Sequence, residues 1–263
     1  MESGVRQLTE SDLNILTTTK QTQFGAIGLT EDGRRYRYVS FGGTSTIAPG
    51  LVVCAAVPTA AYQALAITAS GTGGQVAANY AGNQSSQGVI VLTNGATAVT
   101  QDQFAEGFLE IIVGGAAADA GSYSYRIKGN SAAAASTGYI TVFLAEAFRH
   151  TTALVPGTDT ANLLLSPYST VAATATAGLP VGATIMPVPN TASVTNYGWV
   201  QVGGACNLLN DAGGTITVGG GFGQSVATAG NIVAATASTH PIIGYTRLAI
   251  SASNAGQCWL SLT

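Results

Sequence analysis

The alternation of polar and apolar residues is clearest near the start of the chain, on both sides of the dipeptide Asp32-Gly33. Two strand-like runs, 24–31 and 34–41, flank this dipeptide, which is a typical turn between paired strands. In the second run, strand alternation places two sets of side chains on opposite faces: Arg35, Arg37, Val39 and Phe41 on one, and Arg34, Tyr36, Tyr38 and Ser40 on the other. The pattern predicts a hairpin that presents arginines interleaved with aromatic residues.

The residues before this hairpin, 1–25, are expected to form an N-terminal arm. Thr9 followed three positions on by Asp12 is typical of a capping box, and it predicts a helix of about two turns that carries Leu13 and Leu16. Residues 17–23, TTTKQTQ, are polar and have no period, so they are expected to be extended or disordered when alone. We therefore expect the arm to become ordered against a neighbouring protein.

Short apolar runs separated by turns continue through the rest of the chain. The dipeptide Asn94-Gly95 predicts a hairpin between residues 89–93 and 96–100. Residues 123–128 alternate, with Tyr123, Tyr125 and Ile127 expected to point inward, whereas residues 139–145 are apolar on both faces and are expected to be buried. Later strand candidates are 162–165, 183–187, 198–202, 215–218, 232–236, 244–250 and 257–262.

No segment after the arm has a sustained helical period, and the regular spacing of the strands is typical of a sandwich or barrel. The predicted fold class is mainly β, with β-sandwich or barrel domains and an extended N-terminal arm. A low-complexity stretch at 70–88 indicates a boundary or a long excursion. The expected division is an arm at 1–25, a main β domain made of 26–70 together with 160–263, and an inserted β module at 71–159.

Charge is scarce and unevenly distributed. Charged residues make up 8% of the 263 residues, whereas an ordinary soluble domain has about 25%. Ten of the 21 charges fall in the first 40 residues, and from 160 to 263 only Asp211 and Arg247 are charged. A surface with so few charges risks self-association unless partners cover it. The net charge of −3 argues against an electrostatically driven nucleic-acid partner.

Candidate catalytic chemistry is sparse. The two histidines, His150 and His240, stand in unrelated contexts and form no known motif with the cysteines or serines. Asp102, Glu106 and Glu110 would stack three carboxylates on one helix, but Gly107 breaks that helix and the residues after it favour a strand. The sequence predicts no enzyme activity, no cofactor and no metal site.

Three further patterns bear on the compartment and on possible ligands. The glycine-rich run 219–223 lacks the lysine of a P-loop and the spacing of a dinucleotide fingerprint, so it favours a β turn. Cys54, Cys206 and Cys258 are far apart and odd in number, which favours small buried thiols over a disulfide or a metal site. The start of the chain lacks the basic and apolar stretches of a signal peptide, and the most apolar window, 51–69, contains Pro58 and several polar residues. We expect no membrane partner.

Three passages of the chain form a recognisable series. The first comprises LTESD, the hairpin DGRRYRYV and the apolar TIAPGLVV. The second comprises QFAEGFLEI, SYSYRIKGNSAA and GYITVFL, and the third comprises VGATIMPVPN, NYGWVQVGGAC and the strand-rich C-terminus. Together they resemble a family of tailed-bacteriophage virion proteins described as capsid decoration or cement proteins. The resemblance covers most of the chain in order, although each motif alone has little specificity.

This resemblance implies a β-rich protein without enzymatic activity that binds the outside of an icosahedral head, between capsomers. The implied partners are the major capsid protein and neighbouring copies of the chain, often as a homotrimer. The implied location is the outer capsid surface of the virion, after synthesis in the cytoplasm of the host bacterium. Trp199, in YGWVQVGG, is implied to have a packing role.

The docking residues that we expect are those of the hairpin and the arm: Arg34, Arg35, Tyr36, Arg37, Tyr38, Leu13 and Leu16. Guanidinium groups and aromatic side chains together suit an acidic or carbonyl-rich protein surface. A plain solvated hairpin and a surface for single-stranded nucleic acid are the alternatives at this site. For the whole protein, the alternative is a head or tail fibre protein that binds a receptor on the host surface, and a carbohydrate-active enzyme is disfavoured by the scarcity of carboxylates.

Overall fold

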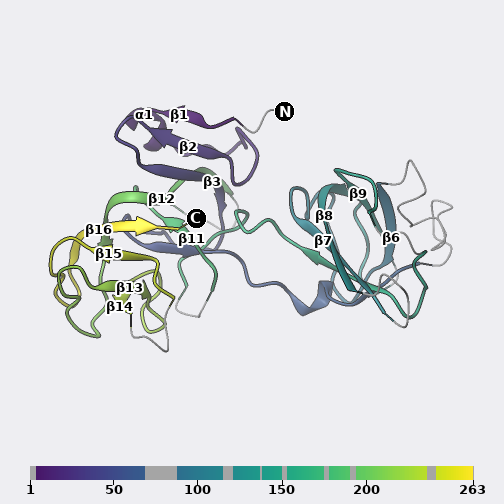
Figure 1. Ribbon diagram of the computed structural model, residues 1–263. Coiled ribbons are helices and arrows are strands. Elements are labelled where there is room, and N and C mark those ends of the chain that lie inside the picture. Colours follow the sequence, from purple (N-terminus) through teal and green to yellow (C-terminus); the bar gives the residue numbers. More distant parts are fainter. Residues whose placement is uncertain are drawn as a thin grey trace. The chain divides into compact units, whose positions relative to one another are not determined.

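The computed structural model describes residues 4–68, 88–114, 121–136, 138–149, 153–174, 178–189, 194–235 and 241–262 (Figure 1). The chain divides into two compact units. One combines Met1–Val57 with Pro167–Thr263, and the other is Pro58–Ser166. Strands dominate both units, so the predicted mainly β fold class is confirmed. No helix in these residues is long and apolar enough to cross a membrane.

The unit Pro58–Ser166 is a six-stranded antiparallel barrel. Its strand order is β5 (Leu65–Ala66), β10 (Thr160–Leu164), β7 (Phe108–Val113), β8 (Gly121–Asn130), β9 (Tyr139–Leu144) and β6 (Val89–Thr93), with a short 3₁₀ helix, η1, at Ala60–Tyr62. A bridge between Ile67 and Leu92 connects the two ends of this order and closes the barrel. Inward-pointing side chains such as Leu109, Tyr125 and Ile140 fill its interior.

The barrel corrects the expected domain boundaries. Strands β5 and β10 were expected in the main domain, but β10 pairs with both β5 and β7 of the barrel. The boundaries therefore lie near residues 57 and 167, outside the expected 71–159. The sequence pattern of a strand does not specify its partner strand. Here the pairing of β10 with β7 places both β10 and β5 in the barrel.

The predicted hairpin at Asn94-Gly95 is wrong. Strand β6 pairs with β9, while Val99 forms an isolated bridge with Ala133. Asn94 is buried, and its Nδ2 donates to the carbonyls of Thr97 (3.0 Å) and Ala134 (2.8 Å). The asparagine therefore stabilises a wide loop. Its side-chain amide binds two backbone carbonyls that, in a tight hairpin, would instead accept hydrogen bonds from a paired strand.

The other unit is built around a ten-stranded sheet. Eight strands follow the order β1 (Arg6–Leu8), β2 (Ile27–Thr30), β3 (Arg35–Phe41), β12 (Asn196–Leu209), β16 (Ala255–Ser261), β15 (Gly244–Thr246), β13 (Gly221–Gln224) and β14 (Ile232–Ala234). Two more, β11 (Pro180–Ala183) and β4 (Val52–Cys54), branch from β12.

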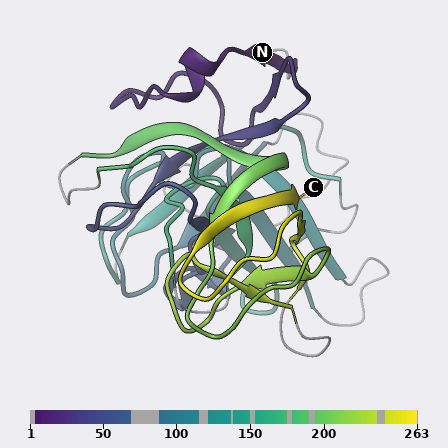
Figure 2. The ribbon, with the colours of Figure 1, turned by 90° about the vertical axis from the view of Figure 1, so that its left-hand side faces the viewer.

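Strand β12 organises this sheet, and Figure 2 shows it curving between β3 and β16. Its first half pairs with β3 and its second half with β16. The change occurs at Gly203 and Gly204, where the register shifts and Gly204 has φ +93°. A Cβ on Gly203 would lie 2.7 Å from Nε of Arg35. At Gly204 the left-handed backbone favours glycine, and at Gly203 a larger residue would have to displace the Arg35 side chain that crosses the bend.

The N-terminal residues belong to this sheet and do not form a free arm. Strand β1 pairs in parallel with β2, and the helix α1 (Glu10–Leu13) follows it. The predicted capping box is confirmed: the Thr9 N–H donates to Oδ2 of Asp12 (2.9 Å), and the Asp12 N–H donates to Oγ1 of Thr9 (3.2 Å). The helix is one turn shorter than expected, and Leu13 closes it by packing into the core.

The predicted hairpin is confirmed as β2 and β3, with a loop one residue longer than the expected two. The Gly33 N–H donates to the Thr30 carbonyl (3.0 Å), and the Thr30 N–H donates to the Arg34 carbonyl (3.1 Å). Gly33 has φ +85°, a conformation that glycine adopts without strain. The connection is thus a three-residue loop that ends on a left-handed glycine.

Candidate binding surfaces

The expected docking arginine Arg34 is already paired within its own chain. Its Nε donates to Oδ2 of Asp32 (2.7 Å), and its Nη2 forms an ion pair with Glu10 on α1. The Thr30 hydroxyl, which donates to Asp32, and the Arg34 guanidinium hold the pKa of the Asp32 carboxyl below its usual range, against an opposing effect of burial. Arg34 therefore joins the hairpin loop to the N-terminal helix.

The other two arginines of the hairpin also contact their own chain. Nη1 of Arg37 donates to the Gly25 carbonyl (2.9 Å), and its guanidinium lies 5.7 Å from the ring centroid of Tyr168. Arg35 is exposed, but its side chain lies against Gly203 at the bend of β12. Both arginines therefore have contacts within the fold, although Arg35 also remains exposed to solvent.

The aromatic and leucine members of the expected docking set are buried or half-buried. Tyr36, Tyr38 and Leu13 share one core cluster with Leu8 and Trp199, and the rings of Tyr38 and Trp199 meet edge to face at 5.2 Å. Leu16 is half-buried and packs against a second cluster. These contacts correct the expectation that the hairpin and arm form an open docking surface, because the tyrosine face of β3 is covered by the N-terminal residues.

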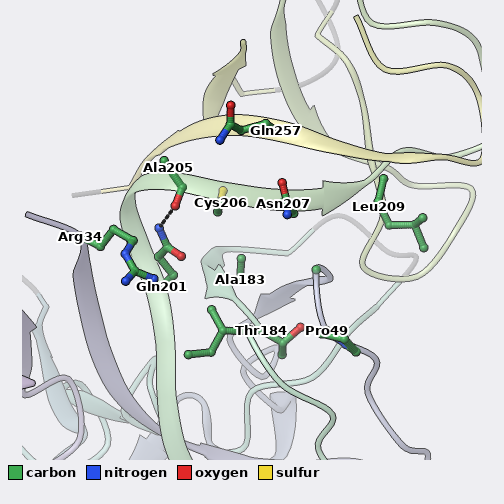
Figure 3. Close-up of a pocket in the computed structure, with 13 residues that line it drawn as sticks. Arg34, Pro49, Ala183, Thr184, Gln201, Ala205, Cys206, Asn207, Leu209 and Gln257 are labelled. Carbon is green, nitrogen blue, oxygen red and sulfur yellow. Dashed lines mark hydrogen bonds between the residues drawn. The ribbon is translucent and has the colours of Figure 1, made fainter. Parts of the chain in front are cut away.

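A groove of about 530 Å³ opens along β12 on the same unit (Figure 3). Gln201 lies at one end, where its Nε2 donates to the Ala205 carbonyl (2.8 Å), and Leu209 lies at the other. Asn207 on β12 and Gln257 on β16 are directly opposite each other and line the groove between these ends. The groove is therefore rich in side-chain amides.

The groove contains no activated nucleophile among its lining residues. Burial raises the pKa of the Cys206 thiol to about 12, so this thiol stays protonated near neutral pH. All three cysteines are free, and no group of three or more His, Cys, Asp or Glu side chains suited to a metal ion occurs among the described residues. His150 and His240 lie outside the described residues.

The three carboxylates spaced by four residues do not gather into a site. Asp102 and Glu106 lie in a turn, both with positive φ, and Glu110 lies on β7. The Glu110 carboxylate accepts hydrogen bonds from Ser122 (3.1 Å) and Asn162 (2.8 Å) on the neighbouring strands. Glu110 therefore connects three strands of the barrel.

Beside the groove, an open patch that we call the β15–β16 face presents two aromatic rings. Trp259 on β16 and Tyr245 on β15 are directly opposite each other and are 53% and 51% exposed. The residues opposite them on the two flanking strands are small: on β12, Ala205 is opposite Trp259, and on β13, Gly221 is opposite Tyr245. Both rings are thus about half exposed, and the side chain of Ile242, itself exposed, lies over Gly221 at the Tyr245 end.

The β15–β16 face also contains polar side chains. Gln257 lies two residues before Trp259 on β16, so both point to the same side of the sheet, and Asn207 lies opposite Gln257. The Arg247 N–H donates to the Gln257 carbonyl (3.0 Å), which places Arg247 beside them. The Arg247 guanidinium makes no ion pair with any residue that the structure describes.

A second apolar patch, the barrel face, lies on the outside of the barrel. Phe108 and Ile112 on β7, and Tyr139 and Phe143 on β9, are each about two-fifths exposed: 38%, 40%, 43% and 43%. Strand β8 runs between β7 and β9 and turns its exposed Arg126 and Lys128 outward. The expectation that residues 139–145 are buried on both sides is thus wrong, since β9 buries only Ile140, Val142 and Leu144.

The β15–β16 face has a signal in the sequence, in the alternation of polar and apolar residues along its last strand. In 257–262, alternation places Trp259 in the same set as Gln257 and Ser261, opposite the apolar set of Cys258, Leu260 and Leu262. A tryptophan among the polar members of a strand is therefore the feature that would have indicated this face.

No protein-family model matches the chain, and comparisons with curated proteins and with solved structures give no match.

Proposed function

We propose that this chain is a structural virion protein that binds the outer surface of an assembled phage capsid, through the barrel face, and stabilises contacts between capsomers. One observation supports the proposal most strongly. Of the six outward positions of β7 and β9, four hold Phe108, Ile112, Tyr139 and Phe143. A solvated sheet face normally has polar residues at such positions, and a patch of large apolar side chains marks an interaction surface.

The composition of the barrel face suits a protein partner. Aromatic and arginine side chains are enriched where protein interfaces gain most of their binding energy. Covering the exposed part of each phenylalanine contributes about 2 kcal/mol, from the usual area of an aromatic ring and the usual gain per unit area. Contacts of this kind depend little on ionic strength, so binding that persists in high salt is expected.

A binding protein of this kind needs no catalytic residue. It acts by mass action, because a protein that binds the assembled shell and not its free subunits shifts the equilibrium toward the shell. A contact of roughly 1,200–2,000 Å² per copy, repeated over a lattice, is sufficient for this effect. The major capsid protein is the partner in this proposal, and neighbouring copies of the chain, as a homotrimer, are the second contact.

The barrel face is tested by replacing two of its rings together, Phe108→Ser with Phe143→Ser. The double variant is expected to bind capsids that lack this protein several hundredfold more weakly, since about 2 kcal/mol is lost at each ring and each 1.4 kcal/mol is a factor of ten in affinity. Co-sedimentation with capsids over a range of protein concentrations measures the change. Both side chains are partly exposed, and circular dichroism checks that the barrel still folds.

The matched control is Val218→Ser with Leu248→Ser, which removes two side chains that are 68% and 61% exposed on the other unit. This control is expected to sediment with capsids as the wild type does. Equal binding by the barrel double variant and the wild type would exclude the barrel face as the docking surface. Failure of the wild-type protein itself to bind would contradict the function.

A further inference from the structure

The β15–β16 face has a composition that capsid docking through the barrel does not explain. We propose that it is a carbohydrate-binding site for a carboxylated oligosaccharide, in which a sugar ring stacks on Trp259 and the sugar carboxylate pairs with Arg247. The site lies in the unit formed by Met1–Val57 and Pro167–Thr263, and it is independent of the barrel face.

The stacking surface follows from the register of four strands, β12, β16, β15 and β13. Trp259 and Tyr245 are cross-strand partners, so their Cβ atoms are separated by about 5 Å and the two exposed rings stand in one row on the same face of the sheet, which we call the aromatic strip. Ala205 flanks this strip beside Trp259, and at the Tyr245 end the side chain of Ile242 lies over Gly221. An aromatic face has negative charge density, which attracts the polarised C–H groups on the apolar side of a sugar ring.

The polar part of the site lies one row further along the same strands. Gln257 and Asn207 each provide an amide with donors and an acceptor, which matches the paired donors and acceptors of neighbouring sugar hydroxyls. Both amides also line the groove of about 530 Å³, which is within the usual range of 300–1,000 Å³ for pockets that enclose small ligands. An oligosaccharide can therefore extend from the aromatic strip into the groove.

The carboxylate is inferred from Arg247. It is the sole charged residue in the sequence after Asp211, and its guanidinium has no ion-pair partner among the described residues. A guanidinium pairs with a planar carboxylate through two parallel hydrogen bonds, so an acidic sugar is favoured over a neutral one. Single-stranded nucleic acid would need a row of cations along its backbone, and this face provides one.

The two tryptophans of the chain make the site accessible to a fluorescence titration. Trp199 is 6% exposed in the core cluster and Trp259 is 53% exposed, so a ligand that changes the emission without unfolding the protein reports on Trp259. The probes are trigalacturonic acid, α2,3-sialyllactose and a hyaluronan tetrasaccharide, each compared with its neutral methyl ester. Isothermal titration calorimetry measures the affinities of the variants.

At least one of the three acidic probes is expected to bind saturably, and its methyl ester at least tenfold more weakly. Trp259→Ala is expected to weaken binding at least tenfold, and Arg247→Gln to reduce the acidic probe to the affinity of its ester. The control Tyr139→Ala removes a comparably exposed ring on the barrel and should leave sugar binding unchanged. Thermal unfolding of each variant checks that the fold is retained.

Three results would overturn the proposal. One is the absence of binding to all three acidic probes, and another is equal affinity for the acidic and esterified forms. The third is loss of capsid binding in Trp259→Ala without any sugar binding by the wild type, which would make this face a protein-docking surface. Capsid binding by the barrel is measured separately, so either proposal can fail without the other.

Discussion

Replacing Leu13 with alanine is expected to destabilise the unit formed by Met1–Val57 and Pro167–Thr263 by about 2–5 kcal/mol, the usual cost of truncating a buried leucine. Leu13 is 2% exposed and packs in one cluster with Leu8, Tyr36 and Trp199. Truncation would leave a cavity between the helix α1 and strand β3. Urea unfolding followed by the fluorescence of Trp199, which lies in the same cluster, measures the loss.

Ile15→Ala is the matched control. Ile15 lies two residues further along and is 52% exposed, so its truncation is expected to change the free energy of unfolding by less than about 0.5 kcal/mol. Equally small effects of the two substitutions would mean that the N-terminal residues are not part of the core. In that case the original expectation of a free arm that docks on a partner would regain support.

The stability of the same unit is expected to fall steeply between pH 8 and pH 11. Burial raises the pKa of Tyr36 from its ordinary 10.0 to about 12, that of Cys54 from 9.0 to about 11, and that of Cys258 from 9.0 to about 12. Above pH 9 the unfolded chain therefore binds fewer protons than the folded one, and the free energy of unfolding decreases as pH rises. The loss at pH 11 is on the order of 5 kcal/mol. Urea unfolding at several pH values measures it.

The Tyr36→Phe variant isolates one part of this pH dependence. The Tyr36 hydroxyl is fully buried and makes no hydrogen bond to any described residue, so its removal should not reduce stability at pH 7. At pH 11 the variant is expected to retain about 1 kcal/mol more of its stability than the wild type. An equal decline in Tyr36→Phe and the wild type would contradict the assigned burial of Tyr36.

Local alternation predicted which side chains share a face of a strand, but not which element covers that face. Tyr36 and Tyr38 fall on one side of β3 as expected, yet Leu8 and Leu13, more than 20 residues away in the sequence, cover them. Their burial depends on the parallel pairing of β1 with β2, for which the short segment Arg6–Leu8 has no distinctive pattern. The expected docking site was therefore assigned to residues that stabilise the fold.

The same reasoning explains the error at Asn94 and the correct prediction of the first hairpin. Asp32-Gly33 lies between two strands that pair with each other, so the local turn signal and the global pairing agree. Asn94 follows a strand whose partner, β9, lies some 45 residues away, and its side chain binds carbonyls of the loop instead. A turn dipeptide indicates that the chain changes direction. It does not determine whether the strand before it pairs with the next segment or with a strand far away in the sequence.

The sequence analysis did not predict that aromatic rings on the binding surfaces would be exposed. Trp259 and Phe143 lie in strands that were predicted, but a large apolar residue in a short strand is more often buried than exposed. Only the alternation with Gln257 for the first, and the pairing on either side of β8 for the second, reveals the outward face. The first feature can be read from the sequence, whereas the second requires the strand partners to be known.

Electron cryo-microscopy of capsids that lack this protein, after addition of the purified chain, tests the central claim most directly. Regular additional density between capsomers is expected, with the six-stranded barrel turning Phe108 and Phe143 toward the shell. Capsids that remain bare at saturating protein concentration, while the chain binds only to host envelopes, would contradict the account.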